Sequence, residues 1–238
     1  MNDSITTIPL ANLALAFIPV IFVFVILYRW SLAYGNAIYA VVRMLVQLLL
    51  MGYLLAYIFE VDNQWVVVAI LFMMVLISCW IALQTVNRSR CFELYKYAVY
   101  AVALGGGSVL FMMTVAVLNI DPWYHASQMV PLAGMVFANT MNSVALAVER
   151  MESEVGRGVD YAEARVIALR TAMIPVINSL FAVGLVSIPG MMTGQILSGV
   201  SPLIAVRYQV MVMCMVFASA GISTALFLVL AKGSYNKK

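Results

Sequence analysis

The stretch from Trp65 to Val86, WVVVAILFMMVLISCWIALQTV, contains no Asp, Glu, Lys or Arg. It is continuously apolar rather than alternating, which argues against a membrane β-barrel strand, and it has about the ~20 residues that an α-helix needs to cross a membrane. Because lipid offers the backbone no hydrogen bonds, such a run predicts a helix that pairs its backbone groups internally. This segment therefore indicates an all-α membrane protein.

The rest of the chain repeats this pattern. Hydrophobic residues make up 65% of the sequence and charged residues 10%, whereas soluble domains carry about 25% charged residues. We predict a single transmembrane domain over residues 1–238, a polytopic bundle of about seven helices embedded in a lipid bilayer. The predicted spans are 9–28, 36–59, 65–86, 97–118, 130–148, 171–188 and 203–230.

Lys and Arg lie almost entirely on one side of these spans. Short cytosolic loops retain positive charge, so this side is predicted to be cytosolic, with the N-terminus outside and the C-terminus in the cytosol. The net charge of +3 is too small and too scattered to predict a nucleic-acid partner. The predicted inside set is Arg29, Arg88, Arg90, Lys96, Arg150, Arg157, Arg165, Arg170, Lys232, Lys237 and Lys238, and the outside set is Asp3, Glu60, Asp62, Asp121 and His125.

The late region is rich in helix-breaking residues, with Pro175, Pro189-Gly190 and Pro202 around the stretch VGLVSIPGMMTGQILSGVSP, residues 183–202. A helix interrupted inside a membrane is tolerated only where protein or a water-filled cavity satisfies the freed backbone. We therefore predict that Pro189, Gly190, Met191 and Met192 contribute to a transport path. An ordinary external loop between two spans is the alternative.

The one charged segment of any size covers residues 149–170, ERMESEVGRGVDYAEARVIALR. Apolar spacing predicts that the fifth span projects until Gly156 and Gly158 stop it, and Asp160 with Glu163 predicts the N-terminus of the next helix. The result is a helical elbow, a name used below for residues 149–170. It could bind a soluble partner, or it could simply connect two spans. The candidate docking residues are Glu152, Glu154, Tyr161, Glu163 and Arg165.

Polar residues inside the predicted spans are the other candidates for a path. Arg43 and Gln47 are four residues apart and share one helix face, and a charge inside a membrane usually faces the bundle interior or a water cavity. Arg43 could instead snorkel to the cytosolic surface. Asn139, Asn142 and Asn178 could line a path or bond helices to one another.

The sequence shows no motif for nucleotide binding or catalysis. No GxxxxGK[ST] occurs, and Gly105, Gly106 and Gly107 lie mid-span, where they favour close helix approach. We therefore predict no enzyme activity, no catalytic residues and no cofactor in this chain. Clustered methionines could bind Cu(I), but mid-span methionines more often act as adaptable fillers, so we predict no metal ligands. The clusters are Met191 and Met192 together with Met211, Met213 and Met215.

Four motifs resemble the FetB-like family of ABC transporter permeases. They are R-x-x-x-Q-L-x-x-x-G-Y at 43–53, P-x-A-G-M-x-x-x-N-x-M at 131–141, VGLVSIPGMMTG at 183–194 and RYQVMV at 207–212. Bacterial members of that family are linked to iron export, and plant relatives are linked to aluminium tolerance and nucleotide-sugar transport. The placement of Gly, Pro and Met in the third motif is specific.

This resemblance implies the permease subunit of an ATP-driven exporter in the inner cell membrane, with a metal ion such as iron as its cargo. Two permease copies would pair with two cytosolic ATPase subunits, which bind ATP and Mg²⁺, and the elbow would contact the ATPase. An ion-driven secondary transporter or channel, or a membrane scaffold, remains an alternative reading of the apolar spans.

Overall fold

The computed structural model describes residues 8–32, 34–60, 63–84, 86 and 88–235. Within these ranges the chain is helical, and the only extended pairing is an isolated bridge between Val183 and Ser187. Seven helical stretches of the described chain are long and apolar enough to cross a membrane. The all-α prediction and the predicted number of spans are therefore confirmed. Four residues used for the orientation, Asp3, Asp62, Lys237 and Lys238, lie outside the described residues.

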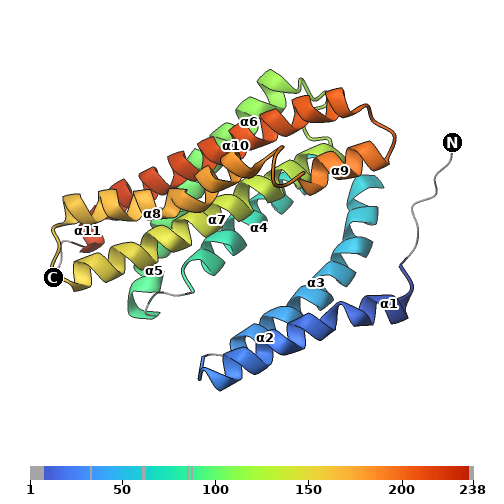
Figure 1. Ribbon diagram of the computed structural model, residues 1–238. Helices are drawn as coiled ribbons and strands as arrows, with labels where there is room; N and C mark the ends of the chain where they lie inside the picture. Colours follow the sequence, from blue (N-terminus) through green and yellow to red (C-terminus); the bar gives the residue numbers. More distant parts are fainter. Residues whose placement is uncertain (1–7, 33, 61–62, 85, 87, 236–238) are drawn as a thin grey trace. The chain divides into compact units, whose positions relative to one another are not determined.

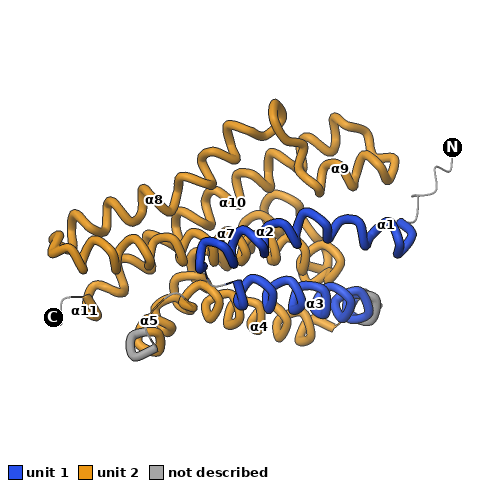
Figure 2. The backbone as a smooth tube through the Cα atoms, turned by 60° about the horizontal axis from the view of Figure 1, so that its bottom comes forward, with its two compact units in different colours: residues 1–61 blue, residues 62–238 orange. Residues whose placement is uncertain are grey.

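The helices fall into two compact units, which Figure 2 shows in different colours. Unit 1, Met1–Val61, contains α1 (Leu10–Leu15), α2 (Phe17–Arg29) and α3 (Tyr34–Glu60). Within it α2 packs along α3, and the Tyr28 and Tyr34 rings meet edge to face at 5.4 Å between centroids. The single transmembrane domain over residues 1–238 stays a prediction.

Unit 2, Asp62–Lys238, holds the other five spans (Figure 1). Its elements are α4 (Gln64–Ala82), α5 (Arg88–Ala101), the π-helix η1 (Val102–Gly106), α6 (Gly107–Phe111), the π-helix η2 (Met112–Val117), α7 (Ala126–Gly156), α8 (Tyr161–Ala182), α9 (Gly190–Leu197), α10 (Pro202–Leu230) and α11 (Lys232–Tyr235).

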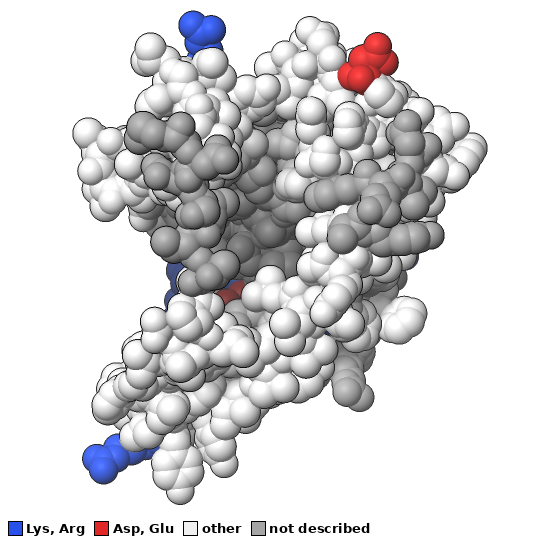
Figure 3. Space-filling model, turned by 90° about the vertical axis from the view of Figure 1, so that its right-hand side faces the viewer, with Lys and Arg blue, Asp and Glu red and all other residues white. Residues whose placement is uncertain are grey.

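Helix α7 lies at the centre of unit 2, where it packs against α4, α8 and α10. Small side chains fill these contacts, as expected for helices that associate in lipid by close packing rather than by the hydrophobic effect. Their fully buried alanines are Ala82, Ala133, Ala147, Ala164, Ala168, Ala172, Ala205 and Ala220. On the face drawn in Figure 3, a few charged side chains interrupt a largely uncharged surface.

The glycines of the fourth span act as predicted at two of three positions. A Cβ added to Gly105 would lie 2.6 Å from Ser223 Oγ and 2.8 Å from Ser223 Cα, so η1 and α10 touch at the backbone there. A Cβ on Gly106 would lie 3.2 Å from a Val136 methyl group. Around Gly107 the space is open, so the prediction of close approach is wrong for that residue.

Side-chain bonds tie together one end of unit 2. The Tyr161 hydroxyl at the start of α8 donates to the carbonyl oxygen of Leu228 at the end of α10. Ser234 Oγ on α11 donates to Glu93 Oε1 on α5 at 2.9 Å. We call this end, which includes the elbow, the basic end, because most of the predicted inside set lies on these elements. The assignment of this end to the cytosol stays a prediction.

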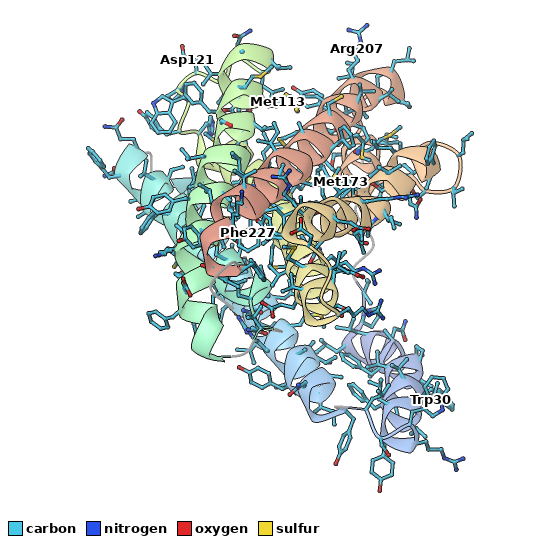
Figure 4. The ribbon with its side chains drawn as sticks, turned by 90° about the vertical axis from the view of Figure 1, so that its left-hand side faces the viewer. Trp30, Met113, Asp121, Met173, Arg207 and Phe227 are labelled. Carbon is cyan, nitrogen blue, oxygen red and sulfur yellow. The ribbon has the colours of Figure 1, made fainter. Side chains whose placement is uncertain are left out.

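The opposite end of unit 2 carries Asp121 and Arg207. Figure 4 shows both labelled residues at this end, and Arg207 lies near the opposite end of α10 from Phe227. Asp121 follows η2, and Arg207 lies on the second turn of α10, where it is exposed. This end also holds the turn from α8 to α9 and is therefore where the late Pro-rich region folds.

The structure corrects two details of the late region. Pro175 does not break a span, because α8 continues through it to Ala182, and the proline's missing N–H removes only one bond of the helical ladder. The predicted sixth span is also too long at its end, since residues 183–189 leave the helix before α9 begins at Gly190. Pro202, by contrast, starts α10 at a first-turn position, where a proline is well tolerated.

The fourth span differs from the regular helix predicted for residues 97–118. It begins earlier and contains η1 and η2, in which the backbone bonds skip one residue more than in an α-helix. In η2 the buried Thr114 hydroxyl bonds back to the carbonyl oxygens of Leu110 and Phe111 at 2.9 and 3.1 Å. Apolar composition is the same for both helix types, so the sequence could not distinguish them.

Candidate functional site

A pocket of about 320 Å³ lies beside the turn that connects α8 to α9. Its walls come from α7, α8, the 183–189 segment, the first turn of α9 and the first half of α10. The lining residues are Met135, Asn139, Ser179, Val183, Ser187, Pro189, Gly190, Met191, Gln209, Val212, Met213 and Val216. We call this the amide pocket, after Asn139 and Gln209.

The turn beside the pocket is compact because Gly184 adopts φ +84°, a left-handed conformation that a side chain would strain. The Gly184 N–H donates to the carbonyl oxygen of Ser187 at 3.0 Å, and the Ser187 N–H donates to the carbonyl oxygen of Ala182 at 3.2 Å. Pro189 then precedes the first residue of α9 in an extended conformation. The sequence PG thus starts a short helix whose first turn faces the amide pocket.

The polar groups of the amide pocket are partly paired with the backbone. Asn139 Nδ2 donates one of its two protons to the carbonyl oxygen of Met135 at 2.8 Å, and its side-chain oxygen can still accept. Ser179 Oγ likewise gives its proton to the carbonyl oxygen of Val176 at 2.7 Å. The strongest feature is Gln209, which is 6% exposed and whose Oε1 finds no hydrogen-bond partner among the described residues.

An unpaired buried acceptor costs free energy, about 1–3 kcal/mol, so its presence calls for an explanation. No charged side chain occurs among the described residues that line the amide pocket. The arrangement therefore offers lone pairs without a fixed charge. It suits a ligand that brings hydrogen-bond donors or positive charge.

A second, smaller pocket of about 240 Å³ shares Met191 with the amide pocket. It includes Leu118 after η2 and Tyr208 next to Arg207, so it lies toward the Asp121 end of unit 2. Gln195 of α9 lines it, and the Gln195 Oε1 atom is also buried with no hydrogen-bond partner in the described chain. Met191 thus separates two cavities that each contain an unpaired amide oxygen.

The structure brings together some of the predicted path residues. Asn139, Pro189, Gly190 and Met191 line the amide pocket, although they come from two distant parts of the sequence. The prediction that the break at 189–192 meets a cavity is thereby supported for these positions. The residues Met192, Asn142 and Asn178 do not line either pocket, the two asparagines being exposed.

Arg43 and Gln47 belong to unit 1. On α3 Arg43 is half-buried and Gln47 is exposed, and Gln47 lines a shallow depression with residues of the same helix. Their part in a transport path, or the snorkelling of Arg43, stays a prediction.

Sequence reasoning missed the residue with the clearest need for a ligand. Gln209 was visible within RYQVMV as an uncharged polar residue in an apolar span, and such residues are costly in lipid unless paired. Met135 and Ser187 lie within the family motifs, and Met213 was considered as a Cu(I) ligand or a filler, but only the fold brings the three residues to one pocket.

The elbow has the helix boundaries predicted from its sequence. α7 ends at Gly156, Gly158 has φ +84°, and the Asp160 carboxylate accepts from the Ala162 N–H at 3.0 Å at the start of α8. Both glycines and the cap therefore act as their residue types suggest.

Two candidate docking residues of the elbow point inward. Glu154 is buried and pairs with Arg150 at 2.7 Å, with Arg157 3.7 Å away. Tyr161 is buried against Tyr235, with 6.1 Å between ring centroids. We assign both to the internal architecture of the elbow. Docking by the more accessible Glu152, Glu163 and Arg165 stays a prediction.

Fold and pocket together define a polytopic helical membrane protein with a cavity between its spans that has no charged side chain among its described lining residues. The chain belongs to the uncharacterised protein family UPF0014, whose model matches residues 10–235. The FetB-like resemblance inferred from the four motifs is therefore confirmed.

Curated relatives match along most of the chain. The probable iron export permease protein FetB of Escherichia coli is 31% identical over 90% of this chain and 86% of its own length. The protein ALUMINUM SENSITIVE 3 of Arabidopsis thaliana is 31% identical over 89% of this chain and 81% of its own. The membrane protein slr1647 of Synechocystis is 34% identical over 80% and 79%, respectively. No solved structure matches the chain significantly.

Proposed function

We propose that this protein is the permease subunit of an ATP-driven, ABC-type exporter that carries a metal cation, such as iron, across the inner cell membrane. A separate cytosolic ATPase would bind ATP and Mg²⁺, and two permease copies would form the membrane part of the complex. The name of the Escherichia coli relative, a probable iron export permease, supports the transport class and the cargo.

One structural observation carries the proposal. α7 and α8 each line the amide pocket, through Asn139 and Ser179, and the same two helices form the elbow at the basic end. A force applied at Glu163 or Arg165 would therefore reach the pocket along two continuous helices. This is the geometry that a permease needs if a soluble motor is to open and close its cavity.

The test is ATP-dependent metal transport in vesicles that contain the permease and its ATPase. Glu163→Lys and Arg165→Glu are expected to lower metal transport per ATP hydrolysed, or to weaken co-purification of the ATPase, with unchanged insertion of the permease. Lys232→Glu is the matched control, because Lys232 is exposed at the same end but lies on α11. ATP-independent flux through the purified permease, driven by an ion gradient, would contradict the proposal and favour a secondary transporter.

A further inference from the structure

The amide pocket has a neutral polar lining. Asn139 Nδ2 and Ser179 Oγ each donate to a backbone carbonyl, and Gln209 Oε1 is an unpaired acceptor. The thioether sulfurs of Met135 and Met213 add groups that can only offer lone pairs. The pocket thus supplies lone pairs from amide oxygen and sulfur beside neutral N–H and hydroxyl groups, with no charged side chain among the described lining residues.

This lining argues against an anionic cargo. Sites for phosphate groups use Arg, Lys or converging backbone N–H groups, and no Arg or Lys occurs among the described lining residues. A nucleotide sugar in this pocket would meet neutral amide and backbone N–H groups, but its phosphate charge would find no compensating cation among the described lining residues.

The same lining argues against a hard, highly charged metal ion. Such ions take carboxylate and other oxygen ligands, and their burial requires negative charge nearby. The described chain holds no group of three or more His, Cys, Asp or Glu side chains that could bind a metal. A cation in the amide pocket would therefore be held by neutral ligands.

The methionines of the pocket narrow the class of cation that it would bind. Three methionines, Met135 on α7, Met191 on α9 and Met213 on α10, converge on the pocket from three helices. Thioether sulfur is a soft ligand that selects Cu(I) over hard ions. A monovalent ion also needs less compensating charge than a divalent or trivalent one, which fits a pocket without carboxylates.

We propose that the amide pocket is a binding site for a soft monovalent metal cation of the Cu(I) class. Met135, Met191 and Met213 supply thioether sulfurs, and Gln209 Oε1 supplies an oxygen contact. The inference rests on the proposed function only for the role of the pocket on a transport path, where it narrows the cargo from a metal cation such as iron to a soft monovalent cation. Binding itself requires neither ATP nor the ATPase.

Binding is measured on the full-length purified protein in lipid nanodiscs, with Ag(I) as a redox-stable substitute for Cu(I). Thiols bind Ag(I) tightly, so all variants carry Cys79→Ala, Cys91→Ala and Cys214→Ala. Equilibrium dialysis with elemental analysis is expected to give one tightly held Ag(I) per chain. Fe(III), Al(III) and a uridine diphosphate sugar are expected neither to bind at this site nor to displace it.

The decisive variant is Met191→Leu with Met213→Leu, which conserves volume and should leave the fold intact. Its Ag(I) affinity is expected to fall by roughly tenfold or more, because two soft ligands are lost. Met211→Leu with Met215→Leu is the matched control, since both residues lie on α10 and are buried without lining the pocket. The control is expected to keep its affinity within about twofold.

Gln209→Leu tests the oxygen contact and is expected to weaken Ag(I) binding less than the double methionine variant. Equal Ag(I) affinity in the pocket and control variants would overturn the inference, as would binding of the trivalent ions or of the nucleotide sugar in place of Ag(I). ATP-driven transport with unaltered Ag(I) binding in the methionine variant would refute this inference alone. Pocket-dependent Ag(I) binding without any ATP-driven transport would refute the proposed function alone.

Discussion

The amide pocket and the basic end of unit 2 are built from the same helices but differ in how their polar groups are satisfied. At the basic end Tyr161 bonds to Leu228, Ser234 bonds to Glu93, and Glu154 is paired with arginine. At the pocket, by contrast, the unpaired oxygen of Gln209 lies beside a cavity, whereas the unpaired Thr224 Oγ1 near the basic end lines neither pocket. One end of the unit is therefore held by side-chain bonds between helices, whereas the other places an unmet hydrogen-bonding capacity where a ligand could reach it.

This comparison separates stability from transport. Substitutions at the basic end should lower the free energy of unfolding. Substitutions in the pocket should instead lower ligand binding and transport, with little effect on the free energy of unfolding.

Tyr161→Ala is expected to destabilise unit 2 most. The change removes a buried aromatic ring packed on Tyr235 together with the bond to Leu228, and truncation of a buried aromatic residue costs about 3–5 kcal/mol. Thermal unfolding of the detergent-solubilised protein, followed by fluorescence, measures the effect. Tyr161→Phe keeps the ring and should cost only about 1 kcal/mol. Equal losses would assign the stability to the hydroxyl instead.

Glu154→Gln is expected to lower stability by about 1–3 kcal/mol, because it leaves Arg150 without its buried anionic partner. The partly exposed Arg150 keeps access to water, which limits the loss. Glu163→Gln is the exposed counterpart on the next helix and should change the unfolding temperature little. A larger loss from Glu163→Gln than from Glu154→Gln would reverse our division of the elbow into interior and surface.

Gly105→Ala tests the contact of η1 with α10, between the two compared regions. The added methyl group would meet Ser223, and overpacking costs about 1–3 kcal/mol, comparable to the loss at Glu154. The clash involves Ser223 Cα and N at 2.8 and 2.9 Å, so a second change of Ser223→Ala should not restore stability. Gly107→Ala, in open space, should be neutral or slightly stabilising. Rescue by Ser223→Ala would show that the backbones can separate.

Gln209→Leu is expected to have the smallest effect on unfolding. The free energy of unfolding should stay within about 1 kcal/mol of the wild-type value, because an apolar replacement removes an unpaired buried acceptor. Transport by the reconstituted complex should nevertheless fall. Thermal unfolding and vesicle transport, measured on the same preparation, check both parts. A stability loss as large as that of Tyr161→Ala would show that Gln209 serves the fold rather than the pocket.

The spans could be predicted from the sequence because each is a long apolar run, and lipid leaves such a run only the helix as a structure. The ends of the elbow were equally readable, since Gly158 and Asp160 act locally on the backbone. The prediction from residue type was wrong at Pro175, because packing against the neighbouring helices keeps α8 continuous despite the lost hydrogen bond.

The composition of the pocket could not be predicted, because it depends on how three helices and one turn meet. Asn139, Pro189 and Met191 were identified as separate polar or helix-breaking features, but nothing in their spacing joins them to Gln209. The inward direction of Glu154 was readable in principle. It lies three residues after the buried Met151, so helical phase places it on the core side, and Arg150 makes that burial tolerable.

The uncharged lining of the amide pocket has a kinetic consequence. Charged clefts draw in ions from a distance and capture them faster at low ionic strength, because their long-range field steers diffusion. A cavity walled by amides and thioethers exerts no such field from its lining. Cation capture by this pocket should therefore proceed at a rate that varies little with added salt, limited by how quickly the ion exchanges its water shell for protein ligands.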